Sequence, residues 1–175
     1  MNFKSLGLSI EVQQALKAAG YQAPTAVQSK TIPAILKGRD VLVAAQTGTG
    51  KTAGFAAPML DILSNSSPPK ANHVKGLILS PTRELAIQLH QAVIDYGRYS
   101  GLSSTAVFGG VKINPQMMIL RKGVHLLIAT PGRLLDLKLQ NAIAFDQLEI
   151  LVLDEADKMM NLGFRAEINQ LLKIL

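Results

Sequence analysis

The chain has 175 residues, of which 48% are apolar and 17% charged, and a net charge of +6. This length suits one ordinary domain, and the apolar content supports a buried core, which argues against intrinsic disorder. The absence of cysteine excludes disulfides and thiolate metal sites. Neither a signal peptide nor an apolar run long enough to span a bilayer is present, so we expect a cytoplasmic protein with no membrane partner. The positive charge suits a polyanionic partner but by itself barely favours nucleic acid.

Short apolar runs alternate along the chain with segments of helical periodicity. The helical segments are expected at 10–19, 28–36, 52–63, 83–99 and 157–175. The runs predicted to be buried strands are Asp40–Ala45, Gly76–Ser80, Ser104–Phe108, His125–Ala129 and Ile150–Leu153. Continuous apolar runs indicate strands that are covered on both faces. The alternation predicts an α/β fold with a mostly parallel sheet, whose ligands bind where the strands end. His90 is expected to be exposed on its helix. Because residues 171–175 end on an apolar helical face, we expect a fragment of a longer protein.

A phosphate-binding loop is predicted between the first strand and the helix that follows it. It comprises Ala45, Gln46, Thr47, Gly48, Thr49, Gly50, Lys51 and Thr52. Small residues let backbone N–H groups turn towards phosphates, and the helix N-terminus adds partial positive charge. Lys51 is expected to reach the outer phosphates of ATP, and the Thr52 hydroxyl to ligate Mg²⁺. The alternative, a glycine-rich turn with a surface lysine, is disfavoured by the flanking elements.

Three acidic residues follow the last predicted strand directly. They are Asp154, Glu155 and Asp157. A buried strand that ends in acids is the pattern of a Walker B site. Asp154 is then expected to complete the Mg²⁺ site, and Glu155 to orient or deprotonate the attacking water. The alternative is a solvated helix start with acids near the helix dipole. The presence of a phosphate loop disfavours that alternative.

With these motifs, the chain resembles the DEAD-box RNA helicase family, whose name spells residues 154–157. Gly20–Gln28 resembles the Q motif of that family, and Phe3 its upstream aromatic residue. Further matches are Pro81–Ala86 to motif Ia, Gly109-Gly110 to the glycine doublet, and Thr130–Arg133 to motif Ib. The run 108–116 is also similar to the bacterial RhlE-type branch.

The resemblance implies that residues 1–175 form the N-terminal RecA-like lobe, a three-layer P-loop NTPase sandwich with the Q motif within residues 1–28. It also implies an adenine site. The Gln28 amide can donate to and accept from the N6/N7 edge of adenine, and Tyr21 can stack on the base. Phe3 is expected to pack nearby. The alternative is that Tyr21 and Phe3 are ordinary core aromatics.

The remaining loops are expected to bind the RNA backbone without reading its sequence. Helix N-termini, threonine hydroxyls and arginines suit phosphodiesters, and a glycine pair permits close approach. The candidate RNA-binding residues are Pro81, Thr82, Arg83, Gly109, Gly110, Thr130, Pro131, Gly132 and Arg133. Helix capping by Thr82 and Thr130 is the plainer function and is expected to operate as well.

The resemblance implies a parent that couples RNA-stimulated ATP hydrolysis to the separation of short duplexes or to the remodelling of RNA–protein complexes. It places the arginine fingers in a second RecA-like lobe and assigns Asp157 to interdomain coupling. The 175-residue chain alone is therefore expected to be nearly inactive. Two alternatives stay open: a helicase that acts on DNA, and a catalytically silent, ATP-dependent RNA clamp.

Overall fold

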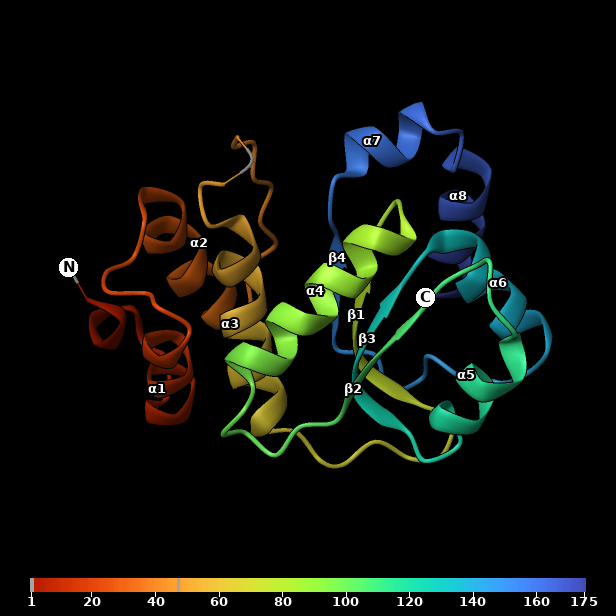
Figure 1. Cartoon of the computed structure of the whole chain (residues 1–175), viewed down its shortest axis with the longest axis horizontal. Helices are drawn as coiled ribbons and strands as arrows, with labels where there is room; N and C mark the ends of the chain where they lie inside the picture. Colours follow the sequence, from red (N-terminus) through yellow and green to blue (C-terminus); the bar gives the residue numbers. More distant parts are fainter. Residues whose placement is uncertain (1, 47) are drawn as a thin grey trace. The chain divides into compact units, whose positions relative to one another are not determined.

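The protein folds as an α/β structure with one parallel sheet (Figure 1). The computed structural model describes residues 2–46 and 48–175. Its elements are η1 (Phe3–Leu6), α1 (Ile10–Ala18), α2 (Ala26–Leu36), α3 (Lys51–Ser64), β1 (Val74–Leu79), α4 (Arg83–Tyr96), β2 (Ser104–Val107), α5 (Ile113–Leu120), β3 (Val124–Ala129), α6 (Pro131–Leu139), β4 (Ile150–Leu153), α7 (Ala156–Asn161) and α8 (Arg165–Ile174). None of the helices within these ranges has the length and apolarity needed to cross a membrane.

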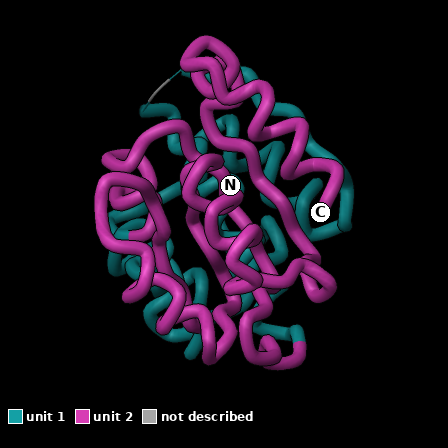
Figure 2. The backbone as a smooth tube through the Cα atoms, turned by 90° about the vertical axis from the view of Figure 1, so that its right-hand side faces the viewer, with its two compact units in different colours: residues 1–66, 91–102 teal, residues 67–90, 103–175 magenta. Residues whose placement is uncertain are grey.

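The chain divides into two compact units, which Figure 2 colours separately. The first unit contains the residues up to Ser66 together with 91–102. The second unit contains residues 67–90 and 103–175. The phosphate loop and the Q-motif segment lie in the first unit, and the sheet with the acidic residues lies in the second.

Helices α1, α2 and α3 build the first unit around fully buried side chains such as Leu16, Ile32 and Met59. The buried Asp61 carboxylate on α3 accepts a hydrogen bond from the Ser9 backbone N–H, 3.1 Å away. Because Ser9 directly precedes α1, this bond connects the start of α1 to α3. Burial of a carboxylate needs such a partner.

The second unit is organised by the sheet, whose strands run in the order β2-β3-β1-β4 and are all parallel. The central strand β1 is buried along its whole length, as a strand covered on both faces should be. Leu77 of β1 aligns with Leu127 of β3 and Leu151 of β4. These residues and the apolar faces of α5, α6, α7 and α8 form one hydrophobic cluster. The parallel arrangement brings the carboxyl ends of all four strands to one edge.

Four of the five predicted strands are confirmed, but the first, Asp40–Ala45, is wrong. Residues 40–45 have no strand structure, and the Leu42 side chain is 100% exposed. The apolar run indicates a strand, but a strand forms only where a neighbour supplies backbone hydrogen bonds. The sheet of the described chain contains β1 to β4, and none of them pairs with this run.

The predicted helix over 157–175 is two helices, separated at Gly163. This glycine has a φ of +89°, in the left-handed region where most residues are strained. The amide of Phe164 donates to the Met159 carbonyl at 3.1 Å, which closes the end of α7. A left-handed glycine just beyond the last turn commonly terminates a helix in this way.

Candidate functional site

The phosphate loop in the first unit is closed by bonds between its own residues. Lys51 Nζ donates to the Ala45 carbonyl at 2.6 Å, and Thr49 Oγ1 donates to the Gln46 carbonyl at 2.8 Å. Gly48 and Gly50 have φ values of +82° and +85°. Such values turn a chain sharply and are adopted by glycine with little strain. Thr47, also predicted to bind nucleotide, lies outside the described residues.

Helix α3 begins directly after this loop, as predicted. Gly50 is its N-cap residue, and among the described side chains none caps the first amides of the helix. Amides at a helix N-terminus have no partner within the helix, so they can bind an anion. Lys51 and Thr52 occupy the first turn and are half-buried. The geometry therefore suits a phosphate group.

Gln28 links the Q-motif segment to the phosphate loop. Its Nε2 donates to the Gly50 carbonyl at 3.1 Å, and its Oε1 accepts from the Thr25 amide at 2.9 Å. The second bond belongs to a capping box that begins α2. A side chain at position 50 would collide with the Gln28 amide nitrogen, so space as well as φ requires glycine there. The Gln28 side chain is fully buried, but its amide keeps one further donor and one further acceptor position.

The aromatic residues of the first unit form a chain of edge-on contacts. The ring centroid of Tyr21 lies 6.3 Å from that of Phe3 and 5.8 Å from that of Tyr96. The Tyr21 and Tyr96 hydroxyls are hydrogen-bonded at 2.8 Å. Phe3 is buried, in agreement with the core alternative, whereas Tyr21 is half-buried. Tyr96 was not predicted, because nothing in its local pattern distinguishes it from an ordinary core position of α4.

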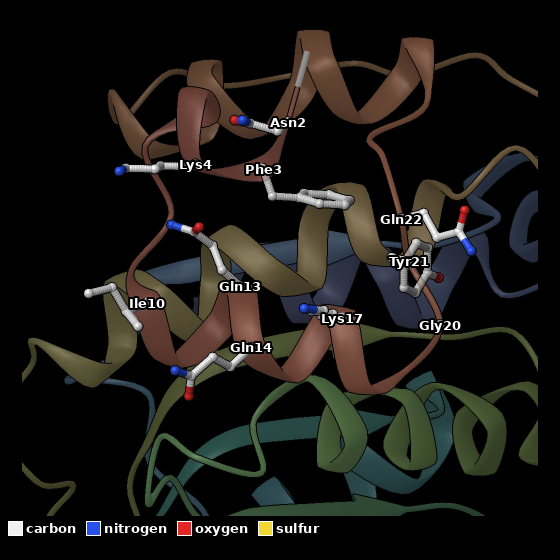
Figure 3. Close-up of a pocket in the computed structure, with 10 residues that line it drawn as sticks. All are labelled: Asn2, Phe3, Lys4, Ile10, Gln13, Gln14, Lys17, Gly20, Tyr21 and Gln22. Carbon is white, nitrogen blue, oxygen red and sulfur yellow. The ribbon is translucent and has the colours of Figure 1, made fainter.

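Phe3 and Tyr21 also line a cavity of about 650 Å³ (Figure 3). The rest of its lining includes Gln13, Lys17 and Gln22. Tyr21 therefore has space beside its ring, whereas a fully enclosed core aromatic would not.

The acidic residues of the second unit follow β4, whose bounds are as predicted. The Asp154 amide donates to the Leu79 carbonyl at 2.9 Å, which fixes its backbone to the end of β1. Glu155 has φ +52° and ψ +47°, a left-handed conformation that costs a residue with a side chain about 1–2 kcal/mol. Its Oε2 lies 3.2 Å from Lys158 Nζ, an ion pair without hydrogen-bond geometry. Asp157 is exposed in the first turn of α7. Strain of this kind is typical of functional sites.

The three candidate RNA loops meet at the carboxyl edge of the sheet, because each follows a strand of the same parallel sheet. The guanidinium of Arg83, at the start of α4, lies over the Phe108 ring, 5.0 Å from its centroid. Arg133 Nη2 donates to the Val111 carbonyl at 2.9 Å. Gly110 has a φ of +77° and its Cα faces Arg83, so a Cβ built there would lie 3.8 Å from Nη1. The structure thus joins these separate segments into one surface.

The two arginines differ in their accessibility. Arg83 is exposed, whereas the Arg133 side chain is only 9% exposed and lies 3.8 Å from Asp136. The expected capping by Thr82 is confirmed, since its Oγ1 accepts from the Leu85 amide at 3.3 Å. The expected capping by Thr130 is wrong, because its side chain makes no cap bond. The helix begins instead with Pro131, whose fixed φ suits that position.

The expectation for His90 was also wrong. This residue was expected to be exposed, but it is half-buried, and its Nε2 lies 3.2 Å from Ser104 Oγ, within hydrogen-bond distance. Burial lowers the pKa of His90, and a hydrogen bond with the Ser104 backbone opposes this shift.

Comparisons with known proteins agree with this arrangement. The family model "DEAD/DEAH box helicase" matches residues 25–175. The ATP-dependent RNA helicase CshA of Limosilactobacillus reuteri is 40% identical over 173 residues, which cover 99% of this chain and 34% of the relative. The ATP-dependent RNA helicase dbp10 of Schizosaccharomyces pombe is 40% identical over 174 residues, 20% of its length.

A solved structure described as a hypothetical ATP-dependent RNA helicase from Sulfolobus tokodaii superposes with a TM-score of 0.84 and 38% identity. The match covers 94% of this chain and 46% of that one, and it confirms the predicted RecA-like α/β fold. The chain spans about a third of the length of the CshA relative. Since the family model covers most of its residues, the chain belongs to the DEAD/DEAH box helicase family.

Proposed function

We propose that residues 1–175 are the N-terminal ATP-binding lobe of an RNA helicase. A second RecA-like lobe of the parent would complete the catalytic site, and the parent would use ATP hydrolysis to separate short RNA duplexes or remodel RNA–protein complexes. The observation that carries the proposal is the hydrogen bond from Gln28 to Gly50, which joins the Q-motif segment to the phosphate loop. The names of the relatives, which describe ATP-dependent RNA helicases, support it.

The nucleotide is assigned to the first unit. The amides at the start of α3 and the left-handed Gly48 and Gly50 suit the phosphates. Lys51 would exchange its bond to the Ala45 carbonyl for a charge-assisted bond to a phosphate, which is the stronger interaction. Tyr21 would offer its ring to adenine, and Gln28 its remaining donor and acceptor positions.

The residues predicted to bind Mg²⁺ and to orient the attacking water also stay predictions. A bound Mg²⁺ would neutralise charge that develops on the phosphates. Thr52, in the first unit, and Asp154, in the second, are the proposed ligands. Glu155 is proposed to orient the water, which agrees with its strained backbone at the end of β4. Asp157, exposed on α7, is proposed to couple to the second lobe.

RNA is assigned to the surface that the three loops of the second unit form. Arg83 is the proposed direct phosphate contact, because this residue is exposed. Arg133 is proposed to contribute mainly through the Val111 carbonyl that it holds. The glycine doublet would admit the sugar–phosphate chain. Placement in the bacterial RhlE-type branch, supported by the run 108–116, and a cytoplasmic location also stay predictions.

Calorimetric titration with ADP tests the nucleotide site. Replacement of Lys51 by alanine should weaken ADP binding at least about tenfold, because a hydrogen bond to a charged group contributes about 1.5–3 kcal/mol. Lys37→Ala is the matched control, since Lys37 is an exposed lysine of the same unit at the end of α2. The control should bind ADP as the unsubstituted chain does. Unchanged affinity of a folded Lys51→Ala variant would contradict the assignment.

A further inference from the structure

The Arg83 guanidinium lies against the ring of Phe108, a residue that is not among the candidate RNA-binding residues. Its central carbon lies 5.0 Å from the Phe108 centroid, within the range of a cation–π contact. Across the described ranges, Arg83 has no ion pair with an acidic side chain. Phe108 is therefore the residue that restricts where this exposed cation points.

The position of Phe108 is set independently of Arg83. Its carbonyl accepts a hydrogen bond from Nε2 of the buried Gln116 at 3.2 Å. Three residues further on, the Val111 carbonyl accepts from Arg133 Nη2 at 2.9 Å. The segment that carries the ring is thus anchored on both sides of the glycine doublet, once by α5 and once by α6. An anchored ring can orient a mobile arginine, whereas a mobile ring could not.

The contact with Phe108 leaves the Arg83 guanidinium able to bind a phosphate. A guanidinium is planar, so its face can rest on a ring while the N–H groups at its edge stay free to donate. Restricting the side chain before RNA arrives lowers the entropy lost on binding. The ring face next to Arg83 is occupied by this contact, which disfavours base stacking there.

We infer that Phe108 is a positioning residue that holds Arg83 ready for a backbone phosphate of RNA. The inference rests on the proposed function, because it takes Arg83 as an RNA contact. It adds a residue that acts through Arg83 and does not itself touch the phosphate. The loop would then have two functions: its glycine doublet admits the RNA chain, and the aromatic residue before the doublet orients Arg83.

A double-mutant cycle tests the inference. The unsubstituted chain, Phe108→Leu, Arg83→Ala and the double variant are titrated against a fluorescein-labelled 20-nucleotide uridine RNA at low salt. Phe108→Leu should weaken binding about two- to fivefold, which corresponds to an exposed cation–π contact. In the Arg83→Ala background, Phe108→Leu should have no further effect, because Phe108 influences RNA binding only through Arg83. Phe108→Tyr, which keeps the ring face, should retain affinity.

Salt dependence gives a second readout that a merely structural role would not change. Loss of one phosphate contact to a single strand lowers the slope of log affinity against log salt by about 0.7. Arg83→Ala and Phe108→Leu should both show a reduction, and Phe108→Tyr should not. Arg83→Lys keeps the charge but replaces the planar group, and provides the same test in a chain with Phe108 intact. It should weaken binding about as much as Phe108→Leu.

The outcomes separate the inference from the proposed function. If Phe108→Leu weakens binding equally with and without Arg83, the ring contacts RNA or supports the fold directly, and the positioning role is overturned. Wild-type affinity of Phe108→Leu and Arg83→Lys overturns it as well. If the unsubstituted chain does not bind RNA at any salt concentration, the RNA assignment itself fails, and the inference fails with it.

Discussion

The hydrogen bond between the Tyr21 and Tyr96 hydroxyls is expected to stabilise the first unit, so loss of either hydroxyl should lower its stability. The two hydroxyls are 2.8 Å apart, and Tyr96 is only 7% exposed. Tyr21→Phe removes the partner of a buried hydroxyl, so it should cost about 1–3 kcal/mol of the free energy of unfolding. Tyr96→Phe leaves the half-buried Tyr21 hydroxyl within reach of water and should cost less, about 0.5–1.5 kcal/mol.

Urea unfolding monitored by circular dichroism measures these changes in the free energy of unfolding, with linear extrapolation to water. The double variant loses both hydroxyls and should be more stable than the sum of the single losses predicts, by about 1 kcal/mol. Tyr99→Phe is the control, because Tyr99 is 52% exposed and its change should stay within about 0.5 kcal/mol. Additive losses in the double variant would refute the idea that the hydroxyls are coupled.

The same pair predicts a response to alkaline pH. Burial raises the pKa of Tyr96 above its ordinary value, and the hydrogen bond with Tyr21 raises it further. The folded state therefore holds this proton more tightly than the unfolded state does. The resulting stabilisation is complete below the unfolded pKa of about 10 and is lost as the pH rises above it. Tyr96→Phe should remove this part of the alkaline loss of stability.

Two further changes test the packing of the second unit, both by urea unfolding. Gly123→Ala should lower the free energy of unfolding by about 2–4 kcal/mol, because Gly123 has a φ of +74° and a Cβ there would collide with the Lys70 carbonyl. The control is Gly101→Ala, which has a similar φ of +69° but open space around the Cβ, and should cost only about 1–2 kcal/mol. Equal costs for the two variants would contradict the predicted collision. Glu149→Ala should cost about 1–3 kcal/mol, because it removes the carboxylate 2.9 Å from the buried Lys75 ammonium. Adding Lys75→Met to the Glu149→Ala variant should then restore stability, because it removes the unpaired ammonium. If the double variant is less stable than Glu149→Ala, the Lys75 ammonium stabilises the fold even without the Glu149 carboxylate.

The strands whose neighbours lie in the sheet were predictable from the sequence, and the one without a neighbour was not. The runs at β1, β3 and β4 are apolar and contact one another along the sheet, so the local pattern and the tertiary structure agree. The run Asp40–Ala45 has the same pattern without a pairing partner in the described sheet. Apolar composition indicates that a segment favours burial, but a β-strand also needs a neighbouring strand to form hydrogen bonds with its backbone N–H and C=O groups.

The sequence predicted where the candidate loops lie, but not which of their side chains contact one another. The rule that ligands bind where parallel strands end brings the loops after β1, β2 and β3 together correctly. The contact of Arg83 with the Phe108 ring and the bond from Arg133 to Val111 join residues 22 or more positions apart. No sequence period reaches over that distance. The left-handed conformation of Glu155 was equally hidden, because glutamate rarely adopts it.

Several candidate ligand-binding groups of this chain already have partners within the protein. Lys51 is bonded to Ala45, Gln28 to Gly50 and Arg133 to Val111. Donors in such loops are costly to leave unpaired, so each bond helps to hold its loop in place, and only Lys51 is proposed to exchange its bond for a stronger one to the ligand. The contribution of Lys51 to nucleotide affinity is then the difference between its bond to the phosphate and the bond to Ala45 that it replaces. Loss of such a side chain therefore changes loop order and ligand affinity together, and only a variant that keeps the internal bond can separate the two.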